Sequence, residues 1–285
     1  MALGLFLLSL LFYIVGCSSM NSIDFSSQLR SRVLKMTHLG QSSHIGSILS
    51  ISDLISVLFT SPSINFRFDD MSCLDRDRLI LSKGHAGAAI YAALNILELL
   101  PDSVLYTHYQ NGSLLSGHVS HLASDYIEFS TGSLGHGLPV STGIALSNKI
   151  KGINRKSISI CSDGELDEGS NWEAILFAAH HKLSNLIMFI DRNKLQSIKS
   201  TEETLALEPL KTKLSSFNWH CVEIDGHSHQ AIEDSINLQS DKPVCIICNT
   251  IKGKGVSFME NEVLWHYRSP TKSDLLLALN ELHDA

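Results

Sequence analysis

Residues 157–195 read SISICSDGELDEGSNWEAILFAAHHKLSNLIMFIDRNKL, and two apolar runs flank a helix-like pattern in this segment. The runs 157–161 and 185–191 have the length and content of buried strands, whereas 172–183 has the apolar spacing of a helix. A strand, a helix and a second strand in this order predict two parallel strands joined by a crossover helix. The segment therefore predicts an α/β fold built on a parallel sheet.

Similar runs on both sides of this segment extend the pattern. Further strands are expected at 78–82, 220–225 and 244–250, and helices at 25–39, 49–60 and 86–100. Because the strands are apolar on both faces, we expect helices to cover the sheet on each side. No repeat and no linker rich in Pro, Gly or Ser divides the chain, so residues 20–285 are expected to form one domain.

The composition is that of a globular protein of 285 residues, with 44% apolar and 18% charged side chains. Lys and Arg number 22 against 29 Asp and Glu, which gives a formal net charge of −7 without any basic run. This balance disfavours nucleic acid or an anionic membrane surface as the main partner. A phosphate ligand would therefore have to be held by local groups.

Six cysteines are scattered through the chain, unlike the dense spacing of a small secreted disulfide framework, and this fits a reducing compartment. Cys245 and Cys248 form a C-x-x-C motif within an apolar run that we interpret as a buried strand. A strand turns positions i and i+3 to opposite faces, so a zinc or redox role is not expected for this pair.

The apolar leader, residues 1–19, is set apart from the domain. Its segment from Ile14 to Cys17 resembles a lipoprotein cleavage motif, but no Lys or Arg precedes the apolar stretch, where a signal peptide normally carries positive charge. The leader is either an extension upstream of a start at Met20 or a targeting or anchoring segment. We expect a cytoplasmic protein in the first case and a membrane-associated one in the second.

Polar side chains follow two strands at the point where each strand ends. Asp163 and Gly164 come directly after the first strand of the opening segment, and Asn193 follows the second. If these strands are neighbours, both side chains project into one crevice at the carboxyl edge of the sheet. A carboxylate and an amide oxygen are hard ligands that suit Mg²⁺, or Ca²⁺, together with substrate phosphates. The pattern predicts a metal–diphosphate site.

This arrangement resembles the thiamine-diphosphate motif, and the longer segment is similar to the cofactor-binding part of transketolases, in particular the N-terminal subunit of split transketolases. The supporting stretches are SSHIGS (42–47), DRLILSKGHA (77–86), SGHVSH (116–121), STGSLGHGL (130–138) and NTIKGKGVSFMENEVLWH (249–266). The resemblance implies a thiamine-diphosphate-binding fold and runs along most of residues 25–270.

By this resemblance, Asp163, Asn193 and the backbone carbonyl of Leu195 would ligate the metal, with Gly164 against the diphosphate. Glu168 would lie at the contact with a partner module, in a carboxylate network linked to cofactor activation. The remaining cofactor-pocket residues implied are His85, Gly132 and Leu134.

Four histidines, His44, His85, His118 and His266, match family positions that face the thiazolium or the sugar donor. Ketol transfer moves protons near neutral pH, where imidazole acts as acid or base, and histidines also hydrogen-bond sugar hydroxyls. His121 lies near the same loops and is open to either a functional or a structural interpretation.

Several neighbouring residues qualify this picture. Ser162 stands where the family motif has glycine, and Tyr267 follows His266 where many relatives have glycine, so the donor pocket could be reshaped. Glu165 and Asp167 are interpreted as a solvated acidic loop, and Trp172 as a packing anchor.

The pyrimidine-binding module of a complete transketolase has no counterpart among the matched stretches. The resemblance therefore implies a heterotetramer with a separately encoded C-terminal subunit. It also implies two-carbon ketol transfer from a ketose donor to an aldose acceptor, with sugars or sugar phosphates as substrates. Two alternatives remain open: a thiamine-dependent 2-oxo acid decarboxylase or acyl-transfer subunit, and a non-catalytic regulatory subunit.

Overall fold

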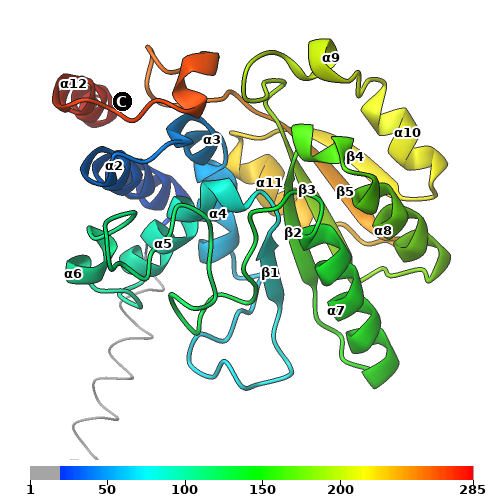
Figure 1. The fold of residues 1–285 in the computed structure, drawn as a ribbon. Coiled ribbons are helices and arrows are strands. Elements are labelled where there is room, and N and C mark those ends of the chain that lie inside the picture. Colours follow the sequence, from blue (N-terminus) through cyan, green and yellow to red (C-terminus); the bar gives the residue numbers. More distant parts are fainter. Residues whose placement is uncertain (1–19, 285) are drawn as a thin grey trace, which may run out of the picture.

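The computed structural model describes residues 20–284 and contains a five-stranded sheet in which every strand pairing is parallel. The strand order is β1-β2-β3-β5-β4 (Figure 1). The strands are β1 Arg78–Leu81, β2 Ser157–Ser162, β3 Leu186–Arg192, β4 His220–Asp225 and β5 Val244–Asn249. The α/β fold and all five strands expected from the apolar runs are confirmed.

Helices cover both faces of the sheet (Figure 1). The longer ones are α2 Ser22–Gly40, α4 Ser52–Thr60, α5 Gly87–Ile96, α7 Gly137–Lys151, α8 Gly169–His180, α11 His229–Ile236 and α12 Lys272–Asp284. The shorter elements are α3 Ile45–Ser50, η1 Gly84–Ala86, α6 Asp102–Leu105, η2 Gly164–Asp167, α9 Thr201–Thr204, α10 Leu210–Ser216 and η3 Val263–His266. The predicted helix 49–60 is wrong at its start, because α3 and α4 meet at Ile51.

The alternation of side chains along each strand divides the core into two layers. In β3, Ile187 and Phe189 pack with α2, α4 and α5, whereas Met188 and Ile190 pack with α8 and α10 on the opposite face. Successive strand residues point to opposite faces, so an apolar run buried on both sides supplies both layers. This confirms the expectation of helices on each side of the sheet.

The C-x-x-C motif lies inside β5, where Cys245 and Cys248 are fully buried in different core layers. Within residues 20–284 no cluster of three or more His, Cys, Asp or Glu side chains could hold a metal ion. Over the same residues no helix has the length and apolar content needed to cross a bilayer. The apolar leader, residues 1–19, lies outside the described part of the chain.

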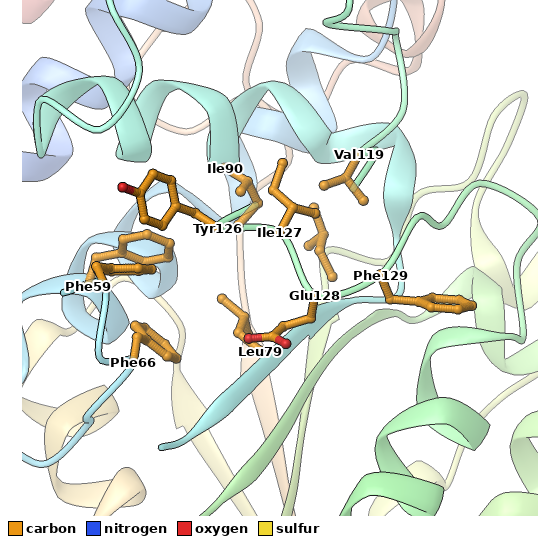
Figure 2. Close-up of a pocket in the computed structure, with 11 residues that line it drawn as sticks. Phe59, Phe66, Leu79, Ile90, Val119, Tyr126, Ile127, Glu128 and Phe129 are labelled. Atoms are coloured by element: carbon orange, nitrogen blue, oxygen red, sulfur yellow. The ribbon is translucent and has the colours of Figure 1, made fainter. Parts of the chain in front are cut away.

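A small apolar cavity lies between α4, β1 and the loop that carries Tyr126 and Ile127 (Figure 2). Its volume is about 30 Å³, room for no more than a few water molecules. The carboxylate of Glu128 at its edge forms ion pairs with Arg76 and Arg78. We interpret this cavity as a packing gap, too small for a substrate.

Phe189→Ala tests the packing of the central strand. Phe189 is fully buried, so its truncation is expected to lower the free energy of unfolding by about 3–5 kcal/mol. Ile150→Ala, at a side chain that is 77% exposed, serves as control and is expected to stay within about 0.5 kcal/mol of the unmodified chain. Urea denaturation followed by circular dichroism measures both, and equal stability of the two variants would contradict the assignment of the core.

Candidate active site

A cavity of about 270 Å³ opens at the carboxyl ends of β2 and β3. It brings together ten of the predicted site residues: His44, His85, His118, Gly132, Leu134, Asp163, Gly164, Asn193, Leu195 and His266. The exception is Glu168, which is exposed at the start of α8. The structure therefore brings these ten residues together around one cavity, and their individual roles stay predictions.

Asp163 connects the ends of the two central strands. Its side chain is nearly inaccessible, and one oxygen, Oδ1, accepts a hydrogen bond of 2.8 Å from the backbone N–H of Gly164. The other oxygen, Oδ2, accepts from the backbone N–H of Lys194 at 2.6 Å and from Nη1 of Arg192 at 3.1 Å. The carboxylate therefore fixes the loop after β2 against the loop after β3.

The donor set around the cavity fits a divalent metal bound to a diphosphate. Asp163 offers a carboxylate, Asn193 an amide oxygen and Leu195 a backbone carbonyl, all hard ligands. A Cβ on Gly164 would lie 2.9 Å from the Gln196 side chain, so glycine at this position lets that side chain pack closely against the loop after β2. Two of the three expected ligands are an amide and a backbone oxygen, which explains why no cluster of His, Cys, Asp and Glu marks the site within residues 20–284.

The four predicted histidines form a compact group that lines the same cavity: His44, His85, His118 and His266. The His44 ring centroid lies 4.8 Å from that of His266, 5.1 Å from that of His85 and 5.9 Å from that of His118. His44 occupies the left-handed region with a φ of 75°, and its backbone N–H donates to the carbonyl of His266 at 2.7 Å. This bond joins chain segments that lie far apart in the sequence.

The comparisons with known proteins identify the family of this chain. The family model described as "Transketolase, thiamine diphosphate binding domain" matches residues 24–275. The chain belongs to the transketolase family. Its chemistry is thiamine-diphosphate-dependent ketol transfer, and the fold class, thiamine diphosphate as cofactor and the transferase assignment expected from the sequence are confirmed.

Two curated relatives, both named as subunits of transketolases, have a similar length to this chain. The apulose-4-phosphate transketolase of Actinobacillus succinogenes has a subunit that is 38% identical over 85% of this chain and 88% of that protein. The 6-deoxy-6-sulfo-D-fructose transketolase subunit SqwG of a Clostridium species is also 38% identical, over 84% and 88%. These matches confirm the assignment to the N-terminal part of a split transketolase.

A solved transketolase from Campylobacter jejuni has the same fold, with a TM-score of 0.85 at 28% identity. The alignment covers 93% of this chain but 43% of that protein. The present chain therefore corresponds to less than half of this whole-length transketolase.

The electrostatic environment keeps the histidines of the transketolase site neutral. Burial, reinforced by neighbouring charges, lowers the pKa of His44 to about 4 and that of His266 to about 3. Burial also lowers the pKa of His118, and it lowers that of His85 well below the usual value, with the Lys83 ammonium acting in the same direction. Neutral imidazoles retain a lone pair, so they accept protons or hydrogen bonds from substrate hydroxyls.

Lys252 is a residue of the site that the sequence analysis did not single out. It is almost fully buried, and its Nζ lies 3.0 Å from Nδ1 of His266 while donating to the carbonyls of Leu195 and Gln196. Burial and the nearby Lys83 lower its pKa to about 8. Lys252 lies in the stretch 249–266 that resembles the family, and this position could have identified it as a candidate site residue.

The prediction that Glu165 belongs to a solvated loop is wrong. Glu165 is fully buried, accepts from Ser82 Oγ, and takes backbone N–H donations from Gly135 at 2.9 Å and Ser162 at 3.2 Å. Burial raises its pKa. Its carboxylate connects the glycine-rich loop before α7 with the end of β2. The acidic sequence around Glu165 does not show these tertiary contacts.

Ser162 and Tyr267, the two positions where the sequence differs from the family pattern, lie in different parts of the cavity. Ser162 lies at its floor, where its Oγ accepts from the backbone N–H of Glu165 at 3.2 Å. Tyr267 is 64% exposed, and its ring centroid lies 4.7 Å from that of His266. Tyr267 thus forms part of the rim beside the histidine group, while Trp172 packs against Phe217 as expected of an anchor.

The lowered pKa values predict how His44 and His266 titrate. Both imidazoles are expected to stay neutral as the pH falls from about 8 to about 5, whereas histidines of the chain unfolded in urea take up protons near pH 6.5. The unfolded state then binds more protons, so the free energy of unfolding should fall as the pH drops from about 6.5 towards 4. Nitrogen-15 NMR of labelled histidine measures the protonation of each imidazole as the pH changes, and the variants His44→Gln and His266→Gln assign the two signals. Titration of these two signals near pH 6.5 would contradict the environment described.

Proposed function

We propose that this transketolase subunit binds thiamine diphosphate through Mg²⁺, or Ca²⁺, held by Asp163, Asn193 and the carbonyl of Leu195. The observation that carries the proposal is that Asp163, Asn193 and Leu195 line one cavity at the ends of two adjacent parallel strands. We assign Gly164, which lines this cavity, to the contact with the diphosphate, and Gly132 lies on the wall beside His118, where a Cβ would come within 3.2 Å of that ring. Leu134 lines the same wall.

Thiamine diphosphate, when bound, supplies the carbanion that ketol transfer requires. The residues of this chain would orient the ketose and move its protons. His85 is fixed by a 2.9 Å contact between its Nε2 and Ser47 Oγ, and His44, His118 and His266 surround the same space. We assign these neutral imidazoles to binding substrate hydroxyls and to taking the proton from the hydroxyl next to the bond that breaks.

A separately encoded C-terminal subunit would complete the site, in a heterotetramer with cofactors at subunit interfaces. Relatives of this length are named as subunits, which supports the proposal. On α8, the exposed Glu168 is followed by Leu176, which is 60% exposed, and by Phe177, which is 42% exposed. We assign Glu168 to the contact with that partner.

The substrates proposed are a ketose donor and an aldose acceptor, as sugars or sugar phosphates. The matched subunits are named for apulose 4-phosphate and 6-deoxy-6-sulfo-D-fructose. Several neutral imidazoles around one cavity supply hydrogen-bond partners for the hydroxyls of a polyol, which supports a ketose donor over a 2-oxo acid.

Reconstitution tests this function. The full chain is combined with a C-terminal transketolase subunit encoded beside it, thiamine diphosphate and Mg²⁺, and ketose phosphates are compared with 2-oxo acids as donors. We expect ketol transfer from a ketose only when both chains are present. Full turnover by this chain alone would overturn the split site, and turnover of 2-oxo acids alone would overturn the substrate class.

Asp163→Ala tests the cofactor site directly. Loss of the carboxylate is expected to weaken binding of thiamine diphosphate in the presence of Mg²⁺ by about 100-fold or more, because a metal ligand is removed. Asp75→Ala is the matched control, since that carboxylate is largely exposed and pairs with Arg155 at the surface. Isothermal titration calorimetry compares the two, and equal affinity would show that Asp163 holds no metal.

A further inference from the structure

Asp191 is a fully buried carboxylate that accepts hydrogen bonds from four different parts of the chain. Lys83, which follows β1, forms an ion pair with its Oδ2, and neither side chain is accessible to solvent. Ser50 Oγ at the end of α3 donates to the same oxygen at 2.6 Å, and Thr250 Oγ1 after β5 donates to Oδ1. The remaining bond comes from Asn193 Nδ2, which donates to Oδ2 at 2.9 Å.

This last bond decides which way the amide of Asn193 points. A carboxylate accepts hydrogen bonds and donates none, so it selects the NH₂ end of the amide. On its other side, Asn193 Oδ1 accepts from the backbone N–H of Leu195 at 3.1 Å. Turning the amide over would place oxygen against oxygen and NH₂ against N–H. The oxygen of Asn193 is therefore held in place, with a second lone pair for another partner.

Lys83 and Asp191 form an ion pair with no solvent access to either side chain, so the Asp191 carboxylate acts as an acceptor on every side. Lys83 Nζ also donates to the carbonyl of Ser47 at 3.1 Å, and Ser47 Oγ contacts His85. The buried Lys83 ammonium thus lies between Asp191 near the end of β3 and Ser47, which contacts His85.

We propose that the buried Lys83–Asp191 pair is a positioning device that fixes the amide of Asn193 for metal binding. The inference rests on the proposed function, because it requires a metal at Asn193. Partners in the second layer around metal sites typically change metal affinity by about 10-fold to 100-fold when they are removed.

The test uses the full chain with the double change Lys83→Met and Asp191→Asn, which removes both charges together. Mg²⁺ is titrated at fixed thiamine diphosphate, and cofactor binding is followed by calorimetry. We expect about 10-fold to 100-fold weaker Mg²⁺ affinity, with cofactor binding restored by excess Mg²⁺. A merely structural role would not produce recovery by metal alone.

The matched control is Arg76→Met with Glu128→Gln, which removes another largely buried ion pair at the small apolar cavity (Figure 2). Equal Mg²⁺ affinity in the two double variants, or a loss that excess Mg²⁺ does not reverse, overturns the inference. Should the Lys83–Asp191 variant fail to fold by circular dichroism, Asp191→Asn alone is judged by the same criteria. If the unmodified chain binds thiamine diphosphate without any need for metal, the proposed function itself has failed.

Discussion

The carboxylate of Asp163, held by the backbone N–H groups of Gly164 and Lys194, is the interaction on which the site depends. It closes the gap between two parallel strands at their carboxyl ends, where the fold places a crevice. Two of its three donors are backbone groups and the third is the buried side chain of Arg192, so the loops after β2 and β3 set most of its geometry. In the proposed complex the metal and the diphosphate would bind at this point, in the cavity that the histidine group also lines.

The cavity contains buried positive charge although the whole protein is negatively charged. The chain carries a formal net charge of −7, yet Lys83 and Lys252 are both buried at or beneath the cavity. Their ammonium groups add to burial in keeping the histidine group neutral. They also supply positive potential to an anionic cofactor that the surface of the protein does not provide. The cavity therefore combines buried lysine side chains with neutral imidazoles in a small volume.

Much of the architecture followed from the sequence because buried parallel strands are apolar on both faces, and each of the five runs became a strand. Asp163 and Asn193 could be located for the same reason, since each ends such a run. Glu165, Lys83 and Asp191 could not, because the sequence shows a charged residue but not its partner: Lys83 and Asp191 lie 108 positions apart. Helix α7 was also missed, because glycine, proline and polar residues interrupt its apolar positions.

The most direct test of this account is a crystal structure of the chain with its partner subunit, thiamine diphosphate and Mn²⁺, with anomalous scattering used to locate the metal. The account predicts one Mn²⁺ peak in contact with the Asp163 carboxylate, the Asn193 amide oxygen and the Leu195 carbonyl, with the diphosphate against Gly164. A cofactor bound with its diphosphate elsewhere, or a metal that touches neither Asp163 nor Asn193, would contradict it.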